Sequence, residues 1–417
     1  MQVAVIGGGV AGVSTAFFLA QAGHEVVVIE RQSNVAEGAS FGNAGTASPT
    51  HALPWAPPGM PGKLLSMLLK GQGPVFIKPR WDRQVWQWAR RWMAECDIER
   101  HRINIERTYR LGAYSQEIMR ELRQQFSFEY ERTQGYLQLY RSAAERASAR
   151  PLHAMLAERE VPHRILEPEE AYLIEPALAR SASLAGALHL PQDDAGNCPL
   201  FCKQLRSAAQ SIGVNFHFGS EVTAIEPPDI GKTGLFVQMG EHRFAVDAAV
   251  LAAGSGSQRL LEPMDIRLPF FPVRSYAATT SIRNFDDAPL ASLADTSSRV
   301  AITRIGTRMR LAGLAEVGMR SEDMHKGAIR ALLKVGQEWF PDAANYNAAT
   351  LWSDVLPTLP DGPPVLGPTP VRNLFLNIGH GTSSWAMAAG AGRILADVIS
   401  GRQPDIDTEG FGMRRFM

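Results

Sequence analysis

The first thirty residues constrain the fold more than any other stretch of the chain. A short apolar strand leads into glycines at GxGxxG spacing, then an apolar helix, then a second strand that ends at an acid. These features are Val3–Ile6, Gly7, Gly9, Gly12, Val26–Ile29 and Glu30. Strand, glycine turn, helix and strand in this order predict a Rossmann-type unit that binds a dinucleotide. The alternative is an ordinary βαβ unit with a glycine-rich turn.

Each residue of this fingerprint has an expected role. Gly7 permits the tight turn after the strand, Gly9 lets the pyrophosphate approach the backbone, and Gly12 lets the helix pack close to the strand. The phosphates then meet the free N–H groups and the positive dipole of the helix start. Glu30 ends the second strand, where an acid accepts hydrogen bonds from the ribose hydroxyls.

Composition and charge exclude several kinds of protein. Lys+Arg and Asp+Glu both number 42, so the formal net charge is zero and no global field would attract nucleic acid. No apolar run approaches the roughly 20 residues that a membrane-spanning helix needs. The first strand begins at residue 3 and leaves no room for a signal peptide ahead of it. We therefore expect a cytoplasmic protein.

The chain has only three cysteines, and two of them lie close together. Cys198 and Cys202 have a CxxxC spacing, which matches no common zinc or redox motif. We expect free thiols that pack in the interior, and no metal site.

Two later stretches resemble the fingerprint in their organisation. Phe244–Gly254 is an apolar strand that ends in small residues, and Leu374–Ile378 is an apolar strand followed by the glycine-rich turn Gly379–Ser384 and a helix. We expect both strands to complete the sheet that the first strand begins. Between them, Arg299–Glu316 alternates as an antiparallel hairpin around Gly306. The nucleotide-binding domain is therefore expected to be discontinuous.

The division that follows from this pattern fits 417 residues, since a domain typically holds roughly 100–200 residues. We assign residues 1–60, 190–262 and 345–401 to the nucleotide-binding domain. Residues 61–189 and 263–344 form a substrate-binding domain, and residues 402–417 form a C-terminal tail.

An arginine-rich stretch carries tryptophans at helical spacing. Trp81, Val85, Trp88 and Trp92 fall on one helix face. A basic helix with tryptophans can lie on a membrane surface. The interpretation we favour is a helix that packs this face against its own protein.

One arginine lies on the apolar face of an expected strand. Val300, Ile302 and Arg304 share one face by the two-residue period of a strand. An arginine there needs a partner, which is either a substrate carboxylate or an internal acid.

Several motifs along the chain form a familiar set. They are Gly7–Gly12, Asn43–Gly45 with Ser48–Pro49, Pro54–Gly59, Gln134–Leu139, Ala301–Arg304, Pro360–Gly362 and Asn377–Thr382. With them the chain resembles the FAD-dependent D-amino-acid oxidase and glycine oxidase superfamily, most closely the D-amino-acid dehydrogenase small-subunit family. The resemblance implies an α/β fold: a Rossmann-type FAD-binding domain with an inserted α+β substrate domain built on an antiparallel sheet.

The resemblance also implies an activity. A D-amino acid would lose hydride from its α carbon to flavin N5, and water would convert the imino acid to a 2-oxo acid and ammonia. Electrons would pass to a quinone or another respiratory acceptor. A partner subunit or a peripheral contact with the inner face of the cell membrane would fit such an acceptor.

The residues expected to contact FAD come from six parts of the chain. They are Gly7, Gly9, Val10, Ala11, Gly12, Glu30, Arg31, Ser40, Asn43, Ala44, Gly45, Val222, Ala253, Gly254, Gly379, His380, Gly381 and Thr382.

Arg304 is the first candidate for holding the substrate carboxylate, with Arg274 and Arg310 behind it. Tyr276 could add a hydroxyl hydrogen bond. His51 and His380 are candidates near the flavin, although a lone histidine is more often structural.

One departure from the family pattern bears on the substrate. Relatives usually read Leu-Arg-Pro before their Asp-Gly turn, and that arginine often grips the substrate carboxylate. This chain reads Val355-Leu356-Pro357. Another residue must then hold the carboxylate, or the substrate is unusual, such as the cyclic amines D-proline and 4-hydroxy-D-proline. A peroxide-producing amine oxidase of the glycine or sarcosine oxidase type, and an inactive flavin-binding subunit, are the rival interpretations.

Overall fold

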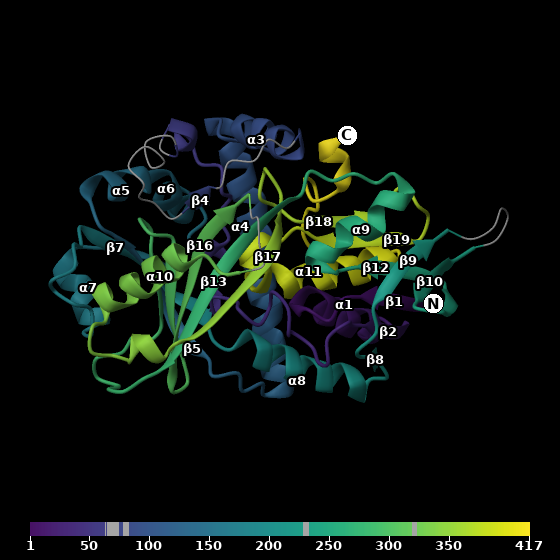
Figure 1. Ribbon diagram of the computed structural model, residues 1–417, viewed down its shortest axis with the longest axis horizontal. Coiled ribbons are helices and arrows are strands. Elements are labelled where there is room, and N and C mark those ends of the chain that lie inside the picture. The colour runs from purple at the N-terminus through teal and green to yellow at the C-terminus, as the bar shows by residue number, and fades with distance from the viewer. Residues whose placement is uncertain (63, 65–74, 78–82, 228–232, 319–322) are drawn as a thin grey trace.

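The computed structural model describes residues 1–62, 64, 75–77, 83–227, 233–318 and 323–417, and it divides into two halves with a large sheet in each (Figure 1). One half contains a six-stranded sheet in the order β18-β19-β12-β1-β2-β8. The other contains a ten-stranded sheet in which β17, β13, β16, β15, β14, β5, β7 and β3 follow one another. The chain has an α/β fold.

The six-stranded sheet is mainly parallel. Its strands are β1 (Gln2–Ile6), β2 (Glu25–Ile29), β8 (Asn215–His217), β12 (Ala248–Leu251), β18 (Val365–Pro368) and β19 (Leu374–Ile378). Strand β1 pairs in parallel with β2 and β12, and β12 pairs in parallel with β19. The expectation that distant strands complete the sheet begun at the N-terminus is therefore confirmed.

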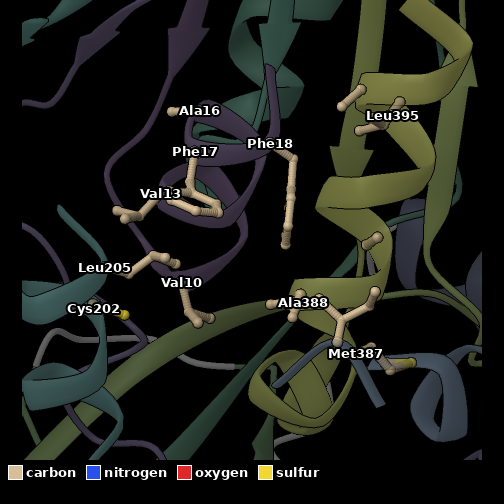
Figure 2. Close-up of a cluster of buried hydrophobic side chains, with 14 of the residues drawn as sticks. Val10, Val13, Ala16, Phe17, Phe18, Cys202, Leu205, Met387, Ala388 and Leu395 are labelled. Carbon is tan, nitrogen blue, oxygen red and sulfur yellow. The ribbon is translucent and has the colours of Figure 1, made fainter. Parts of the chain in front are cut away.

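Helices α1 (Val10–Gln21), α8 (Cys198–Ser211) and α11 (Ser384–Ile399) pack around the core beside this sheet. Figure 2 shows side chains of α1 lying between those of α8 and α11. Phe17 and Phe18 of α1 are buried there, as are Cys202 and Leu205 of α8. The two α8 cysteines are free and buried, as expected.

The ten-stranded sheet is mostly antiparallel, and Figure 1 shows its long strands in green on the side away from the N-terminus. Its strands are β3 (Thr46–Ala47), β4 (Val75–Ile77), β5 (Thr133–Tyr140), β6 (Arg164–Leu166), β7 (Gly186–Ala195), β13 (Phe271–Ser281), β14 (Ser292–Asp295), β15 (Val300–Ile305), β16 (Arg308–Val317) and β17 (Thr350–Thr358). Helix α10 (Lys326–Trp339) packs against it through Leu332 and Trp339. The expected hairpin is confirmed as β15 and β16.

The remaining helices and strands lie around these two large sheets. The helices are α3 (Arg83–Glu95), α4 (Ile98–Phe126), α5 (Ala143–Ser148), α6 (Arg150–Glu158), α7 (Pro168–Ile174) and α9 (Ser257–Leu261). Strands β9 (Val222–Glu226), β10 (Leu235–Met239) and β11 (His242–Val246) form a separate three-stranded sheet. Short 3-10 turns include Pro49–His51, Gly254–Gly256 and Gly381–Ser383.

Two segments differ in secondary structure from what their residues suggest. The run Asp193–Asn197 has the composition of a turn, yet residues 193–195 belong to strand β7, where the Asp194 carboxylate pairs with Arg123 and Arg132 at 2.7 Å each. The stretch 244–254 is two strands in different sheets, and Asp247 between them accepts a hydrogen bond from the Gln2 N–H.

Strand β17 lies within the segment 345–401 that the sequence assigned to the nucleotide-binding domain. It pairs instead with β13 of the ten-stranded sheet. Helix α4 lies within the segment 61–189 assigned to the substrate domain, yet Leu111, Ile118 and Leu122 of α4 join the core cluster of α1 and α11. Neither departure was visible in the sequence, since an amphipathic helix or strand does not reveal its partner.

Helix α3 packs its tryptophan face against its own protein. Trp88 Nε1 donates to the Thr358 carbonyl at 3.1 Å, and Trp92 Nε1 donates to the Trp55 carbonyl at 3.2 Å. Trp81, which was expected on the same face, lies outside the described residues. Among the described residues, no helix is both long and apolar enough to cross a membrane.

Candidate active site

Two adjoining cavities lie between the sheets. The first, of about 170 Å³, is lined by the N-terminal fingerprint and is called the fingerprint cavity below. The second, of about 290 Å³, lies against the ten-stranded sheet and is called the sheet cavity. Ala39, Leu356, Gly381 and Ser384 line both. A ligand that fills the first cavity can therefore reach into the second.

The glycines at the start of α1 allow the backbone to lie close to neighbouring atoms. Gly7 has φ +111°, which favours glycine, and a Cβ added at Gly12 would overlap the Gly7 carbonyl oxygen. Gly9 caps the helix with its backbone alone, and no side chain of the cap residue closes the helix end. Ser40 Oγ accepts from the Val10 N–H at 3.0 Å, and Gly9 and Ala11 on either side line the cavity at this helix start, a place that suits a phosphate.

Glu30 lies at the end of β2 and lines the fingerprint cavity. Its Oε2 accepts from the Gly8 N–H at 2.5 Å, and its Oε1 accepts from the Gln32 N–H at 2.8 Å. Two backbone donors thus fix the carboxylate beside the glycine turn, where an acid can receive ribose hydroxyls.

The second glycine turn closes the cavity from the other side. Gly379 has φ +84° and Gly381 has φ +57°. Asn377 Oδ1 and His380 Nε2 are buried atoms with no hydrogen-bond partner among the described residues, and both residues line the fingerprint cavity. Burial lowers the pKa of His380 to about 4, so its imidazole is neutral at pH 7. These unpaired polar atoms fit a bound dinucleotide that carries its own donors and acceptors.

Arg310 holds the loop between the two cavities. Its guanidinium donates to the carbonyls of Phe41 and Asn43 at 2.8 and 3.1 Å, and to Thr279 Oγ1 at 3.0 Å. Burial lowers the pKa of Arg310 to about 10. Its donors are committed to this loop, so Arg310 positions residues 41–43.

Most of the residues expected to contact the cofactor line a cavity. Those in the fingerprint cavity are Gly7, Gly9, Val10, Ala11, Glu30, Arg31, Ser40, Val222, Ala253, Gly254, Gly379, His380 and Gly381. Asn43, Ala44, Gly381 and Thr382 line the sheet cavity. Gly12 and Gly45 line neither, and each is packed against neighbouring chain.

The expected substrate residues are placed differently. Arg304 lines neither cavity; its guanidinium lies 5.0 Å from the centroid of the Phe285 ring. Arg274 pairs with Glu316 at 3.7 Å and donates to the Asp323 carbonyl at 2.8 Å.

Tyr276 belongs to the same buried network as Arg274. Its hydroxyl donates to Glu316 and accepts from the His325 N–H. Burial, and then this hydrogen bond to Glu316, raise the pKa of Tyr276 to about 12. His51 lies in the 3-10 turn Pro49–His51. Arg274 and Tyr276 do not line the sheet cavity, so the structure does not bring the expected substrate arginines and Tyr276 together there; the side chain of His51 lies outside what the structure describes.

The sheet cavity contains polar residues that the sequence analysis missed, namely His101, Tyr136, Gln138, Asp295 and Arg299. They come from α4, β5, the end of β14 and the β14–β15 connection, so no single stretch of sequence joins them. The one available signal was Arg299 itself, a cationic residue immediately before an apolar strand.

Comparisons with known proteins agree with this geometry. The family model described as FAD dependent oxidoreductase (DAO) matches residues 2–398. The chain therefore belongs to the DAO family of FAD-dependent oxidoreductases, and its cofactor is FAD.

Individual relatives narrow the comparison. The chain is 39% identical to a D-amino acid dehydrogenase of Bradyrhizobium diazoefficiens, covering 100% of this chain and 99% of the relative. It is 40% identical to a D-amino acid dehydrogenase of Rhizorhabdus wittichii, covering 100% of both. Among solved structures, glycine oxidase from Geobacillus kaustophilus superposes with a TM-score of 0.75 at 22% identity, covering 100% of this chain and 98% of that one. L-proline dehydrogenase from P. horikoshii superposes with a TM-score of 0.75 at 17% identity, covering 100% and 97%. These two likenesses bear on the fold alone.

Proposed function

We propose that this chain is an FAD-dependent D-amino-acid dehydrogenase. The observation that carries the proposal is the junction of the two cavities at Leu356, Gly381 and Ser384, where a flavin in the first would face a small molecule in the second. Relatives of the same length, 39% and 40% identical, bear the name D-amino acid dehydrogenase.

FAD, when bound, supplies the acceptor for a hydride from the amino-acid α carbon. The protein contributes position and a dry environment. Arg310 fixes the 41–43 loop, and the start of α11 at Ser384 directs a positive dipole toward the cavity junction. The ten-stranded sheet forms the wall that would keep water from the α carbon.

The cofactor contacts and the division of the chain remain part of this proposal. The half with the six-stranded sheet would hold FAD through the residues named above as lining the fingerprint cavity, together with Asn43, Ala44 and Thr382. The half with the ten-stranded sheet, now including β17, would bind the substrate. His380 is proposed as a flavin contact, and Arg304, Arg274 and Tyr276 receive no role with the substrate.

A cyclic amino acid such as D-proline or 4-hydroxy-D-proline is the proposed substrate. Apolar side chains supply much of the sheet-cavity lining, among them Leu53, Pro54, Trp55, Leu314, Trp352 and Leu356. An apolar wall favours a compact aliphatic ring over a charged or polar side chain. Leu356 contributes no charge at the position where the family resemblance implies an arginine.

The electron acceptor is proposed to be a quinone or another respiratory carrier. An enzyme that reduces a membrane-bound carrier must approach the inner face of the membrane. The outer face of α3 supports such a contact, because Trp86 and Met93 are 58% and 49% exposed beside the exposed Arg90. A partner subunit is the other route for the electrons.

Anaerobic bleaching of the bound flavin tests the proposal. The purified holoprotein is mixed with D- and L-proline, 4-hydroxy-D-proline, D-alanine and sarcosine under argon. Bleaching by the D-prolines with little by L-proline or sarcosine is expected. If D-alanine bleaches well and the D-prolines do not, the cyclic substrate is wrong; if no amine bleaches the flavin, the chain is not the catalytic dehydrogenase.

A second assay separates the dehydrogenase from a peroxide-producing oxidase. In air, the dehydrogenase should reduce an artificial quinone much faster than it forms hydrogen peroxide. Peroxide formed in amounts equal to the amine consumed would instead favour the oxidase.

A further inference from the structure

Arg299 is the last residue of the connection between β14 and β15. Its backbone has φ +53°, an uncommon conformation for an arginine. Gly313 on β16 lies against it with φ +150°, and a Cβ at this glycine would overlap the Arg299 carbonyl oxygen. The glycine at position 313 thus lets strand β16 lie close to the backbone of Arg299. Arg299 and Gly313 both line the sheet cavity.

The guanidinium of Arg299 stands apart from the acids of the described part of the chain. Within the described ranges, no carboxylate forms an ion pair or hydrogen bond with its guanidinium. Asp295, the acid in the same lining, is already engaged by Arg141 at 2.6 Å, by Trp339 Nε1 at 2.9 Å and by the Ser297 N–H at 3.0 Å. A largely desolvated cation without a partner is costly. Burial accordingly lowers the pKa of Arg299.

His101 provides a second polar group beside this cation. It lies in the first turn of α4, whose start is capped by the Asp97 carboxylate. His101 lines the sheet cavity, and its Nδ1 is buried without a hydrogen-bond partner among the described residues. Burial, and then the Arg299 charge, lower the pKa of His101 to about 4. The imidazole is therefore neutral at pH 7 and offers one donor and one acceptor.

We propose that Arg299 binds the carboxylate of the amino-acid substrate in the sheet cavity, with His101 adding a neutral hydrogen bond beside it. A guanidinium matches a carboxylate through two parallel N–H···O bonds, which fixes the orientation of the bound molecule as well as its affinity. The other candidate arginines do not compete for this role. Arg274 and Arg310 have partners elsewhere, and Arg304 lines neither cavity.

This assignment rests on the proposed function and gives it a means of orienting the substrate. A carboxylate anchor, together with the apolar wall that receives the ring, orients the α carbon and directs one of its faces toward the flavin. The chain then needs no arginine at position 356, because Arg299 supplies the positive charge from a different wall of the cavity.

Binding of an unreactive acid tests the assignment without turnover. The probe is (R)-tetrahydrofuran-2-carboxylate, which has the ring and carboxylate of D-proline with oxygen in place of the amine. Its Kd is measured by calorimetry on flavin-loaded wild type, Arg299→Met and the matched control Arg304→Met. We expect about 100-fold weaker binding in Arg299→Met and a change within twofold in Arg304→Met.

A neutral probe separates loss of charge from loss of shape. The corresponding carboxamide should bind Arg299→Met and wild type within threefold of each other. His101→Leu should weaken the acid about fivefold, and His101→Gln, which keeps a hydrogen-bonding group, should weaken it less. If Arg299→Met fails to retain FAD, Arg299→Lys is used, with about 10-fold weaker acid binding expected because the bidentate geometry is lost.

The assignment is overturned if flavin-loaded Arg299→Met or Arg299→Lys binds the acid within threefold of wild type, or if the carboxamide weakens as much as the acid. These results are distinct from failure of the proposed function. If D-amino acids bleach the flavin of the wild type, but the Arg299 variants bind the acid as tightly as the wild type does, only the role of Arg299 as anchor is rejected. If acid binding depends on Arg299, but no D-amino acid bleaches the flavin of the wild type, the dehydrogenase activity is rejected and Arg299 remains part of a carboxylate-binding site.

Discussion

The two cavities are built in different ways, although they share a wall. The fingerprint cavity is formed by short contiguous stretches in which backbone geometry does the binding: the glycine turn after β1, the acid after β2 and the turn after β19. The sheet cavity is lined by residues of α4, β5, β14, β16 and β17, which lie far apart in the chain, together with residues of the 42–57 and 381–384 segments. A backbone site can therefore be recognised from sequence, while a side-chain site depends on which elements meet.

This difference has a functional consequence. A cradle of glycines and helix starts accepts one cofactor and tolerates little change, because added atoms meet backbone. A wall of side chains can exchange an arginine at one position for an arginine at another and still orient a carboxylate. Under the proposed function, the half with the ten-stranded sheet could change its substrate specificity while the half with the six-stranded sheet keeps the same cofactor.

The largest expected effect is in the fingerprint. Gly12→Ala places a methyl group against the Gly7 carbonyl oxygen and pushes the start of α1 away from β1. We expect FAD affinity to fall at least 100-fold, measured by flavin absorbance after dialysis. Gly412→Ala, where a Cβ meets nothing within 4 Å, is the control and should keep full FAD content. Retention of normal FAD by Gly12→Ala would show that the turn is less constrained than the geometry implies.

The next effect is the dependence of stability on pH at His380. Its folded-state pKa of about 4 lies below the unfolded value of 6.5, so the unfolded state takes up the proton first and stability falls as the pH drops from 6.5 toward 4. Between pH 7 and pH 5 this group should cost about 2 kcal/mol of unfolding free energy. His380→Gln should lose less stability than wild type over this interval by that amount, measured by urea unfolding at matched FAD occupancy. Identical losses in the two proteins would show that His380 is not the buried neutral group described.

A smaller effect is expected at Glu30. Glu30→Gln keeps the shape but removes the charge that can receive ribose hydroxyls, so FAD affinity should fall about 5- to 10-fold, or roughly 1 kcal/mol. The Kd for (R)-tetrahydrofuran-2-carboxylate in the flavin-loaded variant should stay within twofold. If Glu30→Gln weakened the binding of FAD and of the acid equally, the two cavities would not bind their ligands independently.

The smallest effect is expected at Arg304. Because this side chain lines neither cavity, Arg304→Ala in a flavin-loaded protein should leave KM and kcat for the D-amino acid within twofold. A 10-fold rise in KM would return Arg304 to the role that the sequence suggested for it.

How much of the molecule could be predicted follows from the same distinction. The parallel sheet, its distant strands and many residues that line the fingerprint cavity were predictable, because glycines, strand ends and helix starts leave local signals. Arg304 was chosen because it follows two apolar residues on one strand face, yet its guanidinium lies against Phe285. Arg299 and His101 could not be paired from sequence, because nothing local shows that the first turn of α4 and the β14–β15 connection line one cavity. The domain boundary at β17 failed for the same reason, since its partner β13 is distant in sequence.

The most direct test of the separation between cofactor and substrate residues is a parallel measurement of two dissociation constants. The Kd for FAD and the Kd for (R)-tetrahydrofuran-2-carboxylate are measured in wild type, Glu30→Gln and Arg299→Met, with the acid titrated into flavin-saturated protein. The account predicts that Glu30→Gln weakens only FAD and that Arg299→Met weakens only the acid. It is contradicted if either variant weakens both ligands to a similar extent, or if Arg299→Met leaves the affinity for the acid unchanged.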